Sequence, residues 1–236
     1  MTNAFRIAWR EIRWEIFGDR GAVLRLGLFA LLPILLVMTG RSTPQGGPNE
    51  LGILTLAIQS ALFPALSGVA LIASTFTQEK ENGTIIPLLA SPVRDIDIVI
   101  GKLIGMILPV LGVCVGSLVL YYILGSEQYG AERVAEALPL TVLYALVVVA
   151  LLYLLSAGSW VLIVAAVVKT SRAGQQISGL LIGLSVAVFA GLGLAAANIA
   201  SGWALVGLGV LLVASDVVAL EIARRVWRRE EVLARL

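Results

Sequence analysis

The sequence predicts an all-α integral membrane protein with six transmembrane helices and an N-terminal amphipathic interfacial helix. Apolar residues make up 59% of the 236 residues and charged residues only 14%, against about 45–50% and 25% in soluble domains. The mean hydropathy is +0.97. The apolar residues also gather into stretches of the length that a bilayer requires, about 20 residues each. We therefore expect lipid to be the solvent of this chain.

The predicted elements follow from the local sequence. Over residues 3–18, Phe5, Trp9, Ile12 and Ile16 recur at helical spacing, which predicts a helix lying on the membrane surface. The predicted spans are 21–39, 51–76, 103–125, 137–168, 177–199 and 203–223. The fourth range is longer than one span needs, so we expect a tilted or broken helix, or a short interfacial piece before it. The whole chain, 1–236, is then a single transmembrane domain.

The distribution of basic residues predicts the orientation. Lys and Arg gather at the N-terminus, in the loop after the second span, in the loop after the fourth span and at the C-terminus. The remaining loops contain only Arg41 and Arg133. The positive-inside rule then places both termini in the cytoplasm. An even number of spans agrees with this, because it places both termini on the same side of the membrane.

Composition excludes several chemistries. The chain has no histidine and one cysteine, Cys114, so Ser-His catalysis, His-ligated zinc and an internal disulfide are excluded. A net charge of +2 is too small to indicate nucleic acid as a partner. The phosphate-binding pattern G-x-x-x-x-G-K-[ST] is missing, because Gly101-Lys102 is followed by Leu103. We therefore expect no catalytic residue, metal or cofactor site in this chain.

The most informative segment is the predicted cytoplasmic loop 77–102. Residues 79–81 are Glu-Lys-Glu, and Asn82-Gly83 follows as a strong turn signal. Thr84 can cap a short helix with apolar residues at positions 85, 86, 88 and 89. Ser91-Pro92 ends that helix. The pattern predicts a short amphipathic helix held at the membrane face between two spans, where a soluble partner can push it.

The same segment resembles a known family. The pattern F-x-x-E-K-E-x-G-T-I-x-x-L-L-A-S-P-V, followed by G-K before a span, is similar to the signature loop of ABC-2 type permeases, the membrane-spanning subunits of ABC exporters. The interfacial helix, six spans and basic C-terminal tail are also similar, so the resemblance covers essentially the whole chain. It implies the ABC-2 type exporter fold, with the loop as a coupling helix that docks an ATP-binding subunit.

The resemblance implies the partners and the site. Two copies of an ABC ATP-binding subunit would carry ATP and Mg, and a second copy or a homologous permease would complete the membrane part. The residues implied in coupling are Glu79, Lys80, Glu81, Gly83, Thr84, Leu88, Leu89, Ser91 and Pro92. A plainer interpretation of the Glu79 and Glu81 carboxylates is a solvated helix end.

The implied activity is export from the cytoplasm of a bacterial or archaeal cell, across the inner membrane. The cargo would be a small or amphiphilic drug, lipid, peptide or ion. Two other classes stay open. A secondary transporter or channel needs an ionisable site within the spans, and an intramembrane enzyme needs clustered carboxylates, for which Asp95 and Asp97 are the nearest candidates. Two aspartates beside a helix start are more often caps.

Polar residues within the spans are candidates for the transport pathway. Asp216 lies in the sixth predicted span, and a carboxylate at membrane depth indicates function by default. The alternative is a position near one face that water reaches. Gln59 and Ser60 interrupt the second span and are further pathway candidates, although such residues also form interhelical hydrogen bonds.

Overall fold

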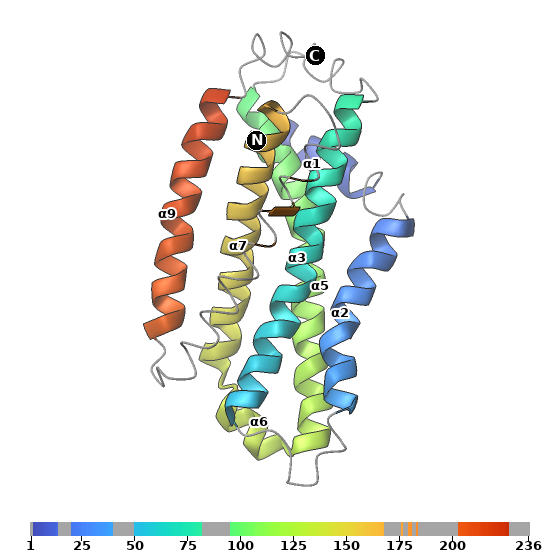
Figure 1. Cartoon of the computed structure of the whole chain (residues 1–236), viewed down its shortest axis with the longest axis vertical. Helices are drawn as coiled ribbons and strands as arrows, with labels where there is room; N and C mark the ends of the chain where they lie inside the picture. Colours follow the sequence, from blue (N-terminus) through green and yellow to red (C-terminus); the bar gives the residue numbers. More distant parts are fainter. Residues whose placement is uncertain are drawn as a thin grey trace.

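The computed structural model describes residues 2–13, 20–39, 50–81, 95–167 and 203–226, together with positions 176, 179, 180 and 183. Regular structure in these ranges is helical throughout. The five long helices form a bundle, with α1 at one end and the short helix α6 at the other (Figure 1). The helices are α1 (Thr2–Glu11), α2 (Arg20–Thr39), α3 (Glu50–Glu81), α5 (Asp95–Tyr129), α6 (Ala131–Ala137), α7 (Leu140–Val167) and α9 (Trp203–Val226).

The chain crosses the bundle repeatedly. Helix α2 runs from the α1 end toward the α6 end, α3 returns, α5 descends again and α7 returns (Figure 1). Helix α3 therefore ends, and α5 begins, at the end where α1 lies. Helix α9 runs in the same direction as α7, so α7 ends and α9 begins at opposite ends of the bundle.

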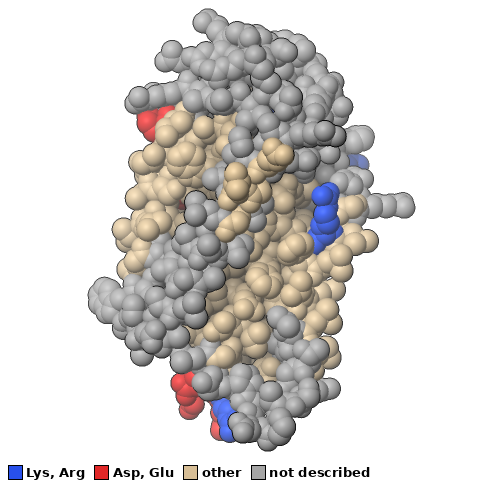
Figure 2. Space-filling model, in the orientation of Figure 1, with Lys and Arg blue, Asp and Glu red and all other residues tan. Residues whose placement is uncertain are grey.

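The helices have the length and composition of membrane spans. Within the described residues, Gly52–Ala73, Ile100–Tyr129 and Leu140–Val161 are long and apolar enough to cross a bilayer, and Val23–Leu35 is a shorter apolar segment. Large hydrophobic side chains face outward, and most of the described surface in Figure 2 is uncharged. An exposed apolar surface of this extent requires lipid around it. The predicted class, an all-helical membrane protein, is confirmed for the described ranges.

Predicted and observed ranges can be compared directly. Helix α2 lies over the predicted span 21–39, and α3 and α5 continue beyond their apolar stretches into charged sequence. The predicted range 137–168 contains the end of α6, a break at Leu138-Pro139 and then α7. The predicted span 177–199 lies outside the described residues except at positions 179, 180 and 183. Six spans remain a prediction.

The break between α5 and α7 has a local cause. Gly130 has φ +95°, a conformation that glycine adopts without steric cost, and it separates α5 from α6. Pro139 lacks an N–H, and its carbonyl accepts hydrogen bonds from the N–H groups of Val142 and Leu143 at the start of α7. Val134 of α6 is fully buried. Helix α6 therefore packs on the bundle and closes this end.

Close helix packing and hydrogen bonds hold the core together. The Tyr121 hydroxyl donates to the Ile53 carbonyl at 2.7 Å and joins α5 to α3. The Ser117 hydroxyl donates to the Ala30 carbonyl at 2.9 Å and joins α5 to α2. Gly68 of α3 lies directly against Val110 of α5, since a small residue lets two helices approach closely.

Candidate functional site

The predicted coupling residues lie at the α1 end of the bundle or outside the described part. Glu79, Lys80 and Glu81 form the last turn of α3. Gly83, Thr84, Leu88, Leu89, Ser91 and Pro92 lie outside the described residues. Because α3 ends and α5 begins at this end (Figure 1), both attachment points of the loop 82–94 lie at the α1 end of the bundle.

Helix α1 has two different faces. Ile7 and Ala8 are buried, and α1 packs against α5. Phe5 and Trp9 are 70% and 59% exposed, so two aromatic side chains project from the protein at this end of the bundle. Aromatic residues of this kind favour the interface between lipid and water. The structure thus shows α1 as both a packing element and a carrier of outward aromatic residues.

The polar pathway candidates of α3 differ in their contacts. The Ser60 hydroxyl is fully buried and donates to the Leu56 carbonyl of the same helix at 2.8 Å. Gln59 is half-buried, and its Oε1 has no hydrogen-bond partner among the described residues. Ser60 thus has a partner for its proton within its own helix, whereas the Gln59 amide oxygen has none among the described residues.

Asp216 lies in a polar cluster between α7 and α9. The Ser156 and Ser215 hydroxyls are 2.9 Å apart, and the Trp160 indole N–H donates to Ser215 Oγ at 3.1 Å. The Ser156 hydroxyl also lies near the Asp216 carboxylate. Asp216 is 8% exposed and Ser159, one turn from Ser156, is 1% exposed. Ser156, Trp160, Ser215 and Asp216 thus meet inside an apolar bundle, and Ser159 shares the same face of α7 as Ser156; the five residues together are the α7–α9 polar cluster.

The donors of this cluster can be assigned by elimination. The Trp160 indole can only donate, and an ionised carboxylate can only accept. When the carboxylate is ionised and takes the single proton of the Ser156 hydroxyl, the Ser215 proton points to Ser156. The chain of donors runs from Trp160 through Ser215 and Ser156 to the carboxylate. Asp216 Oδ1 and Ser159 Oγ have no hydrogen-bond partner among the described residues.

The cluster lies near the middle of both helices. At 1.5 Å per residue, Asp216 is about 20 Å along α9 from Trp203 and about 15 Å from Val226. Ser156 is similarly far from either end of α7. Of the two interpretations of Asp216, this placement favours a carboxylate at membrane depth over one close to a face that water reaches.

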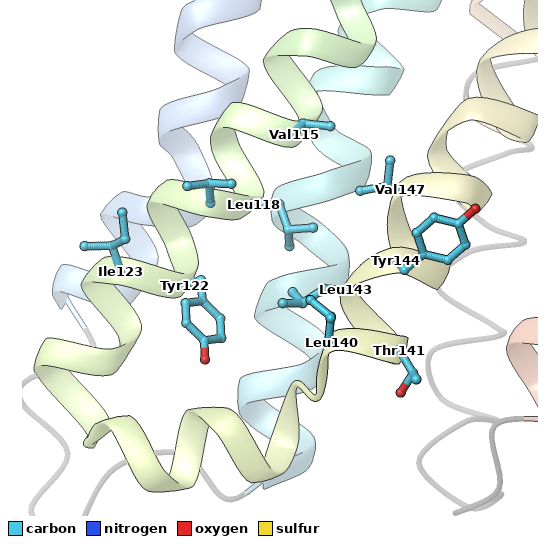
Figure 3. Close-up of a pocket in the computed structure, with 10 residues that line it drawn as sticks. Val115, Leu118, Tyr122, Ile123, Leu140, Thr141, Leu143, Tyr144 and Val147 are labelled. Atoms are coloured by element: carbon cyan, nitrogen blue, oxygen red, sulfur yellow. The ribbon is translucent and has the colours of Figure 1, made fainter.

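A second feature is an apolar pocket between α5 and α7, near α6 (Figure 3). Its volume is about 590 Å³, within the range of about 300–1,000 Å³ that small-molecule sites occupy. Leu140 and Tyr144 on its rim are 82% and 72% exposed, so the pocket opens on the outside of the bundle. Tyr122 and Val147 line it from the two helices. The pocket suits an apolar group.

The pocket and the α7–α9 polar cluster are separate. Val147 and Ser156 are nine positions apart on α7, about two and a half turns, which places them on opposite faces of that helix. One face of α7 thus carries apolar residues toward α5, and the other carries hydroxyls toward α9.

Sequence reasoning did not anticipate Trp160 or the apolar pocket. For Trp160 a signal exists, because positions 156, 159 and 160 share one helix face and combine two serines with an indole. For the pocket no signal exists, since its apolar residues are typical of every span.

The fold and these sites define a helical membrane protein with polar groups enclosed among its spans, as membrane transport proteins have. Residues 41–210 match the family model described as ABC-2 family transporter protein. The chain therefore belongs to the ABC-2 family of transporters, and the resemblance found in the loop is confirmed. No curated protein matches the chain.

Membership of the family has direct consequences. Its members are membrane transport components, and ATP is hydrolysed on a separate ABC ATP-binding subunit with which they normally pair. The match includes the pocket and the α7 half of the α7–α9 polar cluster. It ends before Ser215 and Asp216, so the family assignment says nothing of the α9 half.

Proposed function

We propose that this protein is the permease subunit of an ATP-driven exporter, which moves a small or amphiphilic molecule out of the cytoplasm. The family match over residues 41–210 carries the proposal. Two ATP-binding subunits, with their ATP and Mg, would dock at the α1 end, and a second copy or a homologous permease would complete the membrane part. The host membrane would be a bacterial or archaeal inner membrane with both termini in the cytoplasm.

The arrangement of the helices supports this assignment. Helix α1, the end of α3 and the start of α5 lie at one end of the bundle, where the loop 82–94 would act as the coupling helix. Its movement on ATP binding would shift α3 and α5 as rigid bodies. Residues 177–199 would supply the fifth of the six spans, consistent with the opposite positions of the end of α7 and the start of α9. Asp216, Gln59 and Ser60 stay predictions for the pathway.

The test uses the permease co-expressed with the ATP-binding subunit encoded nearest to it. The double variant Glu79→Lys/Glu81→Lys reverses two charges in the coupling segment. The matched control Glu132→Lys/Glu136→Lys reverses two exposed charges on α6, at the other end of the bundle. We expect co-elution and ATPase stimulation to be lost in the first variant and kept in the second.

An ATP-independent secondary transporter is the second candidate, and the buried carboxylate of Asp216 favours it. This candidate would be supported, and the first rejected, by either of two results. One is co-elution that the Glu79→Lys/Glu81→Lys variant leaves unchanged, and the other is uptake and release that continue without the ATP-binding subunit.

A further inference from the structure

Two buried oxygen atoms in the α7–α9 polar cluster lack a partner. Asp216 Oδ1 and Ser159 Oγ have no hydrogen-bond partner among the described residues, and their side chains are 8% and 1% exposed. A buried carboxylate oxygen without a partner is costly anywhere in a protein, and more so at membrane depth. A pair of such atoms within one cluster indicates that something else fills the place.

The missing group must be a donor. With the carboxylate ionised, the protons of Trp160, Ser215 and Ser156 are already used in the chain of donors described above. Oδ1 can only accept, and Ser159 can turn its hydroxyl to suit a ligand. An anionic ligand would meet the Asp216 charge and is excluded. A cationic ligand that carries N–H groups satisfies both oxygens and neutralises the carboxylate.

The surroundings favour an organic cation over a metal ion. Ca²⁺ and Mg²⁺ need about six or more oxygen ligands, usually several of them carboxylates. The described residues contain no group of three or more metal-ligating side chains. The α7–α9 polar cluster instead offers one carboxylate beside an indole, and an aromatic face attracts ammonium groups.

The position of α9 shows how such a ligand would arrive. Helix α9 packs mainly on α7, and Val213, Val217 and Val218, which flank the carboxylate in sequence, are exposed on the bundle surface. A ligand entering beside these residues would pass through lipid. It would need an apolar tail as well as its cationic head.

We propose that the α7–α9 polar cluster binds the protonated amino group of an amphiphilic amine. Asp216 Oδ1 and Ser159 Oγ accept its N–H groups, and its apolar tail lies along the valines of α9. This inference deepens the proposed function, because the amine would be the cargo, but binding itself needs no ATP-binding subunit.

The test measures equilibrium binding of tritiated dodecylamine to the permease alone in nanodiscs, by scintillation proximity. Dodecylamine is protonated at pH 7, as lysine is. Unlabelled dodecyltrimethylammonium has the same charge without N–H groups, and dodecanol has no charge, so both serve as competitors. We expect saturable binding that dodecylamine displaces at least about tenfold better than either competitor, since hydrogen bonds to charged groups are the strong ones.

The variants locate the site. Asp216→Asn should weaken binding by about tenfold or more, and Ser159→Ala by about threefold. Asp216→Glu, which keeps the charge, should retain part of the affinity. The matched control Glu132→Gln removes an exposed carboxylate on α6 and should bind as wild type. If Asp216→Asn does not elute as a folded protein, Ser159→Ala and Asp216→Glu decide the question alone.

Three results would overturn the inference: no saturable binding, equal displacement by dodecyltrimethylammonium, or affinities unchanged in folded Asp216→Asn and Ser159→Ala. This outcome is independent of the co-elution experiment. If the amine binds but the permease does not associate with the ATP-binding subunit in the co-elution experiment, only the proposed function is rejected. If the two subunits associate but the amine does not bind, only the amine site is rejected.

Discussion

The contact between Gly68 and Val110 allows a quantitative test of the packing of α3 on α5. A Cβ atom on Gly68 would lie 2.8 Å from Val110 Cγ2 and closer still to Cγ1, which no relaxed contact permits. Val110 is fully buried, so it has no free space to move into. Overpacking of this kind costs about 1–3 kcal/mol, against about 1 kcal/mol gained by replacing a helical glycine with alanine. Gly68→Ala should therefore lose up to about 2 kcal/mol of the free energy of unfolding.

The assay measures the free energy of reversible unfolding in mixed micelles. It compares the wild type, Gly68→Ala, Val110→Ala and the double variant with one control. Val110→Ala makes room for the new methyl group. The double variant Gly68→Ala/Val110→Ala should therefore lose less unfolding free energy than the two single variants lose in sum. Interaction energies of about 0.5–3 kcal/mol are typical of residues in contact. The control is Gly112→Ala on α5, where a Cβ would meet nothing within 4 Å. If Gly68→Ala behaves like Gly112→Ala, or if the two substitutions are additive, the helices do not meet as described.

Two further predictions concern interhelical hydrogen bonds. Tyr121→Phe removes the donor to the Ile53 carbonyl and should cost about 0.6–1.7 kcal/mol of unfolding free energy, the range measured for such bonds in membranes; an unchanged unfolding midpoint would show that the bond contributes nothing. Ser215→Ala removes the link between Trp160 and Ser156, so the emission of Trp160 should shift, measured as the difference spectrum against the same substitution in a Trp160→Phe background. An identical spectrum would contradict the contact.

Much of the helical architecture is predictable from the sequence, because a bilayer imposes a length and an apolar composition on each span. The apolar stretch beginning at 103 is one example, and α5 crosses the bundle there. Its start at Asp95 has no hydrophobic signal, but Asp95 and Asp97 are typical of a helix start, and the helix begins there. The interruption at Leu138-Pro139 has a sequence signal in the proline, whereas the burial of Val134 depends on tertiary contacts.

The candidate sites were predictable only as single residues. Asp216 is evident as a carboxylate in an apolar stretch, but its proximity to Ser156 joins positions 60 residues apart and depends on how α7 packs against α9. Ser60 illustrates the opposite case. It has the same polar character in the sequence, yet its hydroxyl donates to the carbonyl one turn earlier, the usual arrangement for serine within a helix.

The interface between α7 and α9 differs in kind from the rest of the bundle. Helices α3, α5 and α7 each contact several neighbours and share buried apolar clusters, and Tyr121 and Ser117 add hydrogen bonds to backbone carbonyls. Helix α9 packs mainly on one neighbour, contributes Leu212 to the buried core and meets α7 through Ser215 and Asp216. Apolar side chains gain little from one another in lipid, so polar contacts largely specify where such a helix lies. A ligand that bonds to Asp216 therefore acts on the same contacts that position α9, and binding there is coupled to the packing of that helix.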